Sequence, residues 1–230
     1  MCIRDSVITM LTSSFRKILN ATYVNNTGGS HELFTKNILL IEGFTEVSKK
    51  QIQFNSEEFW KNHYLKNWDK ASNIPNKTVI IQPFGSQKTP DKIIKYKNIL
   101  IPWEDKSSKD IKPTYNGGLP KLECFYIFTS EKHDKTTIFR GKDIISKETR
   151  DRLIAHHEAH KKLDEEFNKS EKNQVDEYNR GFIFYTRAMY EQRCSHLPTG
   201  INNDYFIHPQ RENIEKNIID WAQKVDTTDI

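Results

Sequence analysis

Apolar residues recur at the three- and four-residue spacing of an amphipathic helix near both ends of the chain. One such pattern occupies residues 12–26 and ends at a flexible Thr-Gly-Gly-Ser segment. The other occupies residues 212–225, where Ile214, Ile218 and Trp221 recur on one side. Both segments are therefore predicted to be helices that bury one face against a core.

A third helix is predicted over residues 56–71. Ser56 is a suitable N-cap, and the two glutamates that follow it suit the positive end of the helix dipole. Trp60, Tyr64 and Trp68 then recur every four residues, which places three aromatic rings on one face. An aromatic face of this kind is more often core than a platform for stacking on bases.

Residues 146–178 form a long, charged stretch that favours one or two helices. Leu153, His157, His160 and Phe167 approximate one face of it, and lysines and glutamates cover the others. Such a composition predicts helix surface that is largely in contact with water.

Short runs rich in β-branched and aromatic residues fill the middle of the chain. They predict strands at residues 78–81, 93–96, 99–103, 122–129 and 136–140. Pro102 cannot donate a hydrogen bond to a neighbouring strand, so its strand is expected at a sheet edge or with a bulge. Helices on both sides of a run of strands predict an α/β fold, with a central mixed sheet flanked by helices in a single domain over residues 1–230.

Composition agrees with a folded protein of 230 residues. Its 36% hydrophobic and 11% aromatic content is too high for a disordered chain, and its 29% charged content is too high for a membrane protein. The net charge of +4 permits a polyanionic partner without requiring one. Lysines are frequent between residues 88 and 112, whereas acids concentrate near residues 164–166. Solvated loops and strands explain most clusters of this kind.

The three cysteines, Cys2, Cys124 and Cys194, are widely spaced, which suggests neither a disulfide framework nor a structural zinc site. Residues 7–11 are too short for a signal core or a membrane span, so a cytoplasmic location and no membrane partner are expected. Residues 1–6 read poorly as the start of a domain, and we interpret them as a misplaced start or a non-native extension.

The candidate chemistry lies where two predicted strands form a hairpin. Asp91 begins the first strand and Glu104 ends the second, so the hairpin brings these two carboxylates together. Side chains alternate along a strand, so Lys106 projects to the same face as Glu104 while Asp105 points away as a bystander. Two converging carboxylates form a hard oxygen site for Mg²⁺, with Lys106 available to stabilise developing negative charge.

The segment Pro90-Asp91, followed by Glu104-Asp105-Lys106, resembles the P-D…(D/E)-x-K motif of the restriction-endonuclease-like nuclease superfamily. Further similarity to type II restriction enzymes lies in Gly85-Ser86-Gln87, in Ser107-Ser108 and in Tyr115-Asn116, where Tyr115 stands in place of an expected tryptophan. The resemblance covers residues 78–145. From the five motif residues alone, a turn with a surface ion pair remains the alternative.

The resemblance implies a restriction-endonuclease-like core over about residues 78–145 and Mg²⁺-dependent hydrolysis of double-stranded DNA at a short specific sequence. It implies that Asp91 and Glu104 hold the metal and that Lys106 is the catalytic cation. Relatives often add an acid from an upstream helix, for which Glu57 and Glu58 are the candidates, although helix capping explains both.

A homodimer is expected, because a two-fold protein most simply cuts both strands of a palindromic site. Contacts to DNA are expected from the loop before the first carboxylate, from the segment after Lys106 and from the C-terminal third. The candidate residues are Gln87, Ser107, Ser108, Lys109, Lys112, Tyr115, Asn116, Arg187, Arg193 and His196. The alternatives are a repair or recombination nuclease of the same superfamily and an inactive DNA-binding module.

Two other features invite a catalytic interpretation. His156 and His160 have the spacing of a zinc-protease helix, but Glu158 does not directly follow the first histidine as that mechanism requires. Cys124 lies in an apolar strand pattern with no identifiable base, as an ordinary buried thiol does. A polar helix face and a core cysteine are the preferred interpretations.

Overall fold

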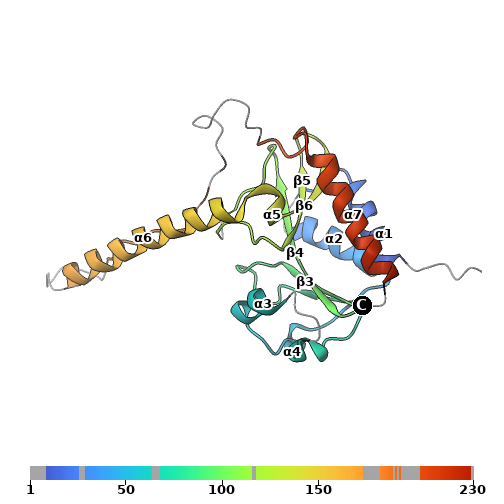
Figure 1. Cartoon of the computed structure of the whole chain (residues 1–230), viewed down its shortest axis with the longest axis horizontal. Helices are drawn as coiled ribbons and strands as arrows, with labels where there is room; N and C mark the ends of the chain where they lie inside the picture. The colour runs from blue at the N-terminus through green and yellow to red at the C-terminus, as the bar shows by residue number, and fades with distance from the viewer. Residues whose placement is uncertain are drawn as a thin grey trace, which may run out of the picture.

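A six-stranded mixed sheet forms the centre of the molecule (Figure 1). The computed structural model describes residues 9–25, 29–63, 68–115, 118–172, 182–188, 190, 192 and 203–228. In spatial order the strands are β1 (Thr45–Glu46), β2 (Thr78–Ile81), β3 (Lys92–Tyr96), β4 (Ile99–Ser108), β5 (Phe125–Ser130) and β6 (Lys135–Arg140). Neighbours are antiparallel except β1·β2 and β4·β5, which are parallel. The predicted α/β class and mixed sheet are confirmed.

β4 is the longest strand, and its two halves have different neighbours. Its first half pairs with β3 as far as the Lys92–Trp103 pair, and its second half pairs with β5 from Trp103 onward. The expectation that Pro102 lies in an edge strand or at a bulge is wrong. Pro102 is tolerated inside the sheet because β5 begins to pair only at the next residue, so no β5 carbonyl needs its missing N–H.

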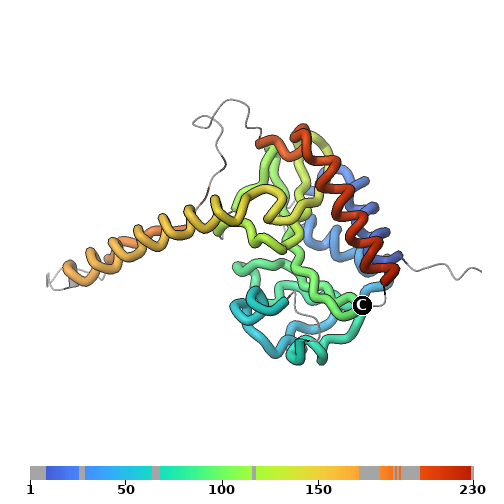
Figure 2. Tube along the Cα trace, viewed as in Figure 1, coloured from blue at the N-terminus to red at the C-terminus, as the bar shows by residue number. Residues whose placement is uncertain are grey.

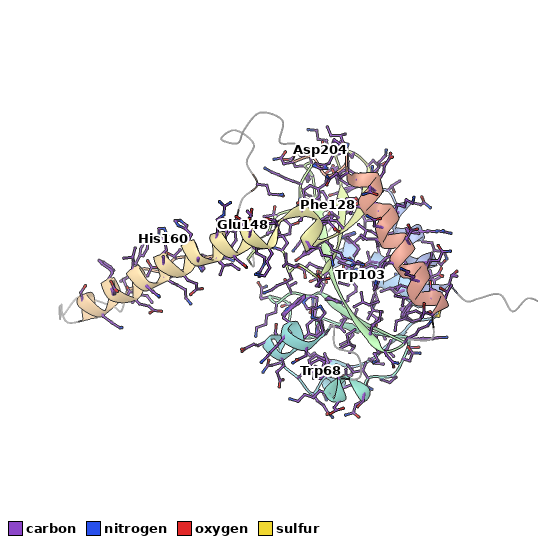
Figure 3. All side chains as sticks on the ribbon, in the orientation of Figure 1. Trp68, Trp103, Phe128, Glu148, His160 and Asp204 are labelled. Atoms are coloured by element: carbon purple, nitrogen blue, oxygen red, sulfur yellow. The ribbon has the colours of Figure 1, made fainter. Side chains whose placement is uncertain are left out.

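Three helices cover one face of the sheet: α1 (Met10–Leu19), α2 (Ser30–Ile41) and α7 (Arg211–Thr227). Their apolar sides pack on strand residues such as Ile127, and Trp103 is fully buried among them, near the middle of the molecule (Figure 3). Helices are confirmed near both ends of the chain, but the first ends at Leu19 and not near residue 26 as predicted.

The N-terminus of α1 is capped by a residue from the far end of the chain. Its own N-cap side chain makes no capping hydrogen bond. The buried carboxylate of Asp226 instead accepts from the backbone N–H groups of Leu11 and Thr12, at 3.2 and 2.9 Å, and from the hydroxyl of Tyr96 at 2.8 Å. This carboxylate ties α7 to α1 and to β3.

On the other face, the predicted helix over residues 56–71 is divided. α3 (Ser56–Asn62) and α4 (Asp69–Ser72) are separate, because Trp68 has an extended backbone immediately before α4. Tyr64 lies outside the described residues. The N-cap of α3 is Asn55 rather than the predicted Ser56, since the Asn55 side chain accepts from the Glu58 N–H at 2.9 Å. The aromatic residues of this region form a separate apolar cluster with Ile80 and Ile93.

The sixth strand leads into a short helix, α5 (Gly141–Ile144), and then into α6 (Lys147–Lys172). The 26-residue α6 projects away from the sheet as an arm (Figure 2). The described segment 182–188 carries no strand or helix, and η2 (Lys49–Gln51) is a single 3₁₀ turn. Within the described ranges, no helix combines the length and the hydrophobicity needed to cross a membrane.

Candidate active site

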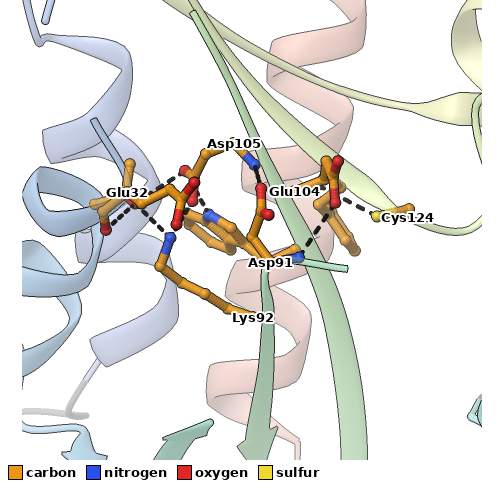
Figure 4. A network of polar contacts seen from close by, with 9 residues as sticks. Glu32, Asp91, Lys92, Glu104, Asp105 and Cys124 are labelled. Carbon is orange, nitrogen blue, oxygen red and sulfur yellow. Dashed lines mark hydrogen bonds and ion pairs between the residues drawn. The ribbon is translucent and has the colours of Figure 1, made fainter. Parts of the chain in front are cut away.

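The β3–β4 hairpin brings Asp91 and Glu104 together (Figure 4). Lys92 pairs with Trp103, so Asp91 stands immediately before the paired stretch and Glu104 immediately after it. The Asp91 N–H donates to Glu104 Oε2 at 3.2 Å. The Asp105 N–H in turn donates to Asp91 Oδ2 at 2.8 Å. Backbone hydrogen bonds therefore hold both carboxylates in place.

The alternation of β4 places Lys106 beside Glu104, as predicted. Lys106 Nζ lies 2.8 Å from Glu104 Oε1, and the Lys106 side chain is 23% exposed while that of Glu104 is 7% exposed. The cation therefore reaches the surface of the site, and the carboxylate beneath it is largely withdrawn from water.

The acidity of Asp91 is strongly altered by this environment. Burial, with the nearby charges of Glu104 and Asp105, raises the pKa of Asp91 to about 8. Burial alone would lower the pKa of Lys106, but the adjacent Glu104 outweighs it, so the pKa of Lys106 is raised. Asp91 and Glu104 thus share Lys106 as their nearby positive charge. Two carboxylates with one cation favour the binding of a second cation or of a proton.

Asp105 points to the opposite face, as predicted, but it is not a bystander there. It forms a buried ion pair with Lys92. Asp105 Oδ1 also accepts from Thr35 Oγ1 at 2.9 Å and from Trp103 Nε1 at 3.1 Å. The contact with Thr35 fixes β4 to α2 at Asp105. The backbone N–H of the same residue, Asp105, donates to the carboxylate of Asp91.

The candidate site opens into a cleft of about 660 Å³. Asp91, Glu104 and Lys106 line it. Its other lining residues are Glu32, Ser86, Gln87, Lys88, Thr89, Asp105, Ser107, Thr114, Tyr115, Gly118, Leu119, Lys121, Tyr126 and Arg187. A short segment before β3, in which Thr89–Pro90 is a cis peptide, forms one wall. Trp60 Nε1 donates to the Thr89 carbonyl at 3.3 Å and so anchors this wall to α3.

The structure separates the proposed DNA contacts into two groups. Gln87, Ser107, Tyr115 and Arg187 line the cleft. Three others, which the structure describes, do not line it: Ser108, Lys109 and Lys112. Asn116, Arg193 and His196 lie outside the described residues.

The upstream acid that lines the cleft is Glu32 of α2. Glu57 and Glu58, both in the described part of the chain, do not line it. Glu58 instead caps α3 and pairs with Lys70 at 2.6 Å. Sequence reasoning missed Glu32 because its place depends on how α2 packs against β4, which no local pattern reveals.

Lys88 and Lys121 add positive charge to the cleft. Lys88 belongs to the lysine-rich stretch between residues 88 and 112. Lys121 lies outside that stretch, and no sequence pattern indicated that it would line the cleft. Burial lowers the pKa of Lys121, and nearby Arg150 lowers it further. Cys124 is fully buried in the aromatic cluster that Tyr126 also joins, as its strand pattern predicted.

No family model matches this chain, and no curated protein and no solved structure matches it either.

The donor set fits a hard divalent cation better than zinc. Among the described residues, no three His, Cys, Asp or Glu side chains form a group that could hold a metal. Mg²⁺ is commonly held by one or two carboxylates, with water and substrate phosphate as its other ligands. Asp91 and Glu104, which converge beside a polar cleft, supply such a pair. His156 and His160 lie on exposed positions of the arm, with ring centroids 4.6 Å apart.

Proposed function

We propose that this chain is a Mg²⁺-dependent endonuclease that hydrolyses phosphodiester bonds in double-stranded DNA, in the manner of a type II restriction enzyme with a restriction-endonuclease-like core. The observation that carries the proposal is the convergence of Asp91, Glu104 and Lys106 at one cleft. A turn with a surface ion pair would leave these groups exposed. Here Glu104 is buried, and the burial of Asp91 raises its pKa.

The chain's own groups have distinct tasks in such a reaction. Asp91 and Glu104 would hold Mg²⁺, which when bound supplies an acidified water and charge stabilisation at the phosphate. Lys106 lies on the exposed side of Glu104, where its ammonium can stabilise the negative charge that develops on a phosphate oxygen. The hydrogen bonds from the Asp91 and Asp105 backbones keep the carboxylates oriented before substrate arrives.

Four basic side chains line the cleft beside its four acidic ones, and they can contact the phosphates of a bound strand. Lys88, Lys106, Lys121 and Arg187 line it, so successive phosphates along one strand can each find a cation. Gln87 provides an amide near the reacting carboxylates, which suits a base edge or a phosphate oxygen. We further propose a homodimer acting in the cytoplasm.

Cleavage of unmodified plasmid DNA in the presence of Mg²⁺ tests the proposal. Discrete bands are expected, and excess EDTA should abolish them. Asp91→Asn, Glu104→Gln and Lys106→Met should each lower the cleavage rate by about a thousandfold or more, because each removes a group needed at the scissile phosphate. Thermal unfolding of each variant establishes that it is folded.

Glu123→Gln is the matched control, since Glu123 pairs with Lys142 at the surface, outside the cleft. It should cut like the unaltered protein. Cleavage that persists in EDTA, or full activity in Asp91→Asn, would overturn the site. Cutting confined to branched or damaged duplexes would instead indicate a repair or recombination nuclease, and tight DNA binding without any cutting would indicate an inactive binding module.

A further inference from the structure

The arm formed by α6 lacks the packing that normally stabilises a helix. Every residue from 147 to 170, all of which the structure describes, is exposed or half-buried. Figure 3 shows His160 far from the sheet, on a stretch of the arm that no other helix or strand of the described residues covers. Most helical stability in proteins comes from packing an apolar face. A 26-residue helix without such packing therefore suggests a missing partner.

The returning chain covers one flank of the arm. Asn168 exchanges two hydrogen bonds with the backbone of Phe184, at 2.7 and 3.0 Å. The Thr186 N–H donates to Asp164 Oδ2 at 2.5 Å. These contacts place segment 182–188 along the side of α6 that carries Asp164 and Asn168.

The uncovered side of the arm carries a heptad seam. Its residues follow one another at alternating spacings of three and four, as the core positions of a coiled coil do. They are Leu153, His156, His160, Leu163 and Phe167. The apolar members are 37%, 61% and 53% exposed in that order.

We propose that the arm seam pairs with the same seam of a second copy of this chain, as an antiparallel two-stranded coiled coil. The seam is symmetric about its middle, so one register aligns every core position with a core position of the second copy. In that register His156 meets His160 of the second copy, Leu153 meets its Leu163, and Phe167 meets its Thr149. One Leu–Leu layer and one Phe–Thr layer on each side then enclose two central histidine layers.

The charge pattern of the arm supports pairing with a second copy of this chain. In this register residues 163–170 of each copy lie against residues 146–153 of the other. Residues 163–170 have three acidic side chains and one basic, whereas residues 146–153 have three basic side chains and two acidic. Antiparallel pairing therefore places a net negative stretch of each arm against a net positive stretch of the other.

One pair of flanking residues makes this complementarity specific. Arg152 and Glu166 occupy equivalent flanking positions on the side of the seam away from segment 182–188, and both are exposed. In antiparallel coiled coils such positions face each other across the seam, so Arg152 of each copy meets Glu166 of the other. The acidic excess of residues 163–170 disfavours DNA as the partner of the seam, because phosphates would repel it.

The arm is long enough for such a seam. At about 1.5 Å per residue, 26 residues span about 39 Å, or between three and four heptads. The two central histidine layers would fix the register, as polar core residues do in other coiled coils. The pairing rests on the arm alone and does not require the nuclease proposal.

Sedimentation of the whole chain over a range of concentrations, with reciprocal charge reversals, tests the pairing. Arg152→Glu alone and Glu166→Arg alone should each weaken the dimer by about tenfold, because symmetry converts two attractive pairs into repulsive ones. The double variant, Arg152→Glu with Glu166→Arg, should restore the dimer. A loss of folding cannot produce this restoration.

A second pair of variants alters the seam itself. Leu163→Glu should leave a monomer, whereas His160→Leu should strengthen the dimer at least tenfold, because it places a leucine in each of the two central histidine layers. Lys169→Glu, outside the seam and its facing flank, is the matched control and should change little. A monomer at every concentration, or single charge reversals without effect, would overturn the pairing. Loss of DNA binding in Leu163→Glu, in a chain that is already monomeric, would overturn it in favour of a nucleic-acid surface.

Discussion

The candidate site and the arm both carry many charged residues, but the structure holds those charges in opposite ways. At the site, the Lys92–Asp105 pair has side chains that are 1% and 0% exposed, and Asp105 has further hydrogen-bonding partners. On the arm, the Lys147–Asp151 pair is 78% and 49% exposed, and it belongs to a helix with no buried residue over 147–170. The same kinds of residue are therefore fixed in one region and solvated in the other.

This contrast determines what each region can do. Charges removed from water cost free energy unless they are paired, so a buried network persists only where the surrounding fold enforces it. Such enforcement holds groups in the orientation that catalysis needs. Exposed charges make weak pairs that water and salt screen, which suits the recognition of a second surface. Buried, fixed charges at the site therefore fit the proposed catalytic role, and exposed charges on the arm fit the proposed pairing.

The largest effect on stability is expected at the buried pair. Asp105→Ala leaves Lys92 charged and unpaired inside the protein, and it also removes the acceptor of Thr35 and Trp103. We expect a loss of about 3–5 kcal/mol in the free energy of unfolding, measured by denaturant titration. The double variant Lys92→Met with Asp105→Leu should recover most of this loss. A single variant as stable as the unaltered protein would show that the network contributes little.

A pH-dependent effect is expected at Asp91. Its pKa is raised from 3.8 to about 8, so the folded protein holds this proton more tightly than the unfolded chain does. The contribution of Asp91 is therefore fully present below about pH 4 and is lost as the pH rises to about 8. Asp91→Asn, which cannot ionise, should be more stable than the unaltered protein at pH 9, by several kcal/mol at about 1.4 kcal/mol per pKa unit.

Unfolding of both proteins across this pH range, in EDTA, measures the difference. The two stability curves should converge toward pH 4. Glu57→Gln is the matched control, since Glu57 is exposed and lies outside the cleft. Parallel curves for Asp91→Asn and the unaltered protein would contradict the raised pKa.

The smallest effect is expected on the arm. Leu163→Ala should change the free energy of unfolding by less than about 0.5 kcal/mol at concentrations where the chain is monomeric, because Leu163 is 61% exposed. Leu39→Ala is the matched comparison, since Leu39 of α2 is fully buried in the core and its truncation should cost about 2–5 kcal/mol. Equal losses at both positions would mean that the arm already packs against the monomer.

Much of the fold followed from local patterns. Strands β2, β3 and β6 and the closing helix α7 match predicted segments to within two residues at each end, and β5 begins three residues later than predicted. Alternation and helical spacing report which side of an element is buried. The hairpin that joins β3 to β4 was also predicted from the sequence. The two-residue β1 was not foreseen, because its parallel pairing with β2 joins Thr45 to Thr78 across a long stretch of chain.

The candidate site divides in the same way. The sequence by itself determined that Asp91 would stand opposite Glu104 and that Lys106 would share the face of Glu104, since a tight hairpin and a two-residue period leave no other arrangement. Only the tertiary structure decided that Glu32 joins the cleft and that Lys92 pairs with Asp105 against Thr35.

Tertiary structure alone also decided that Asp226 caps a helix 215 residues away. Each of these contacts depends on how helices pack on the sheet, and that packing balances the burial of many side chains at once. A local pattern specifies which face of an element is apolar, but not which residue of another element will meet it.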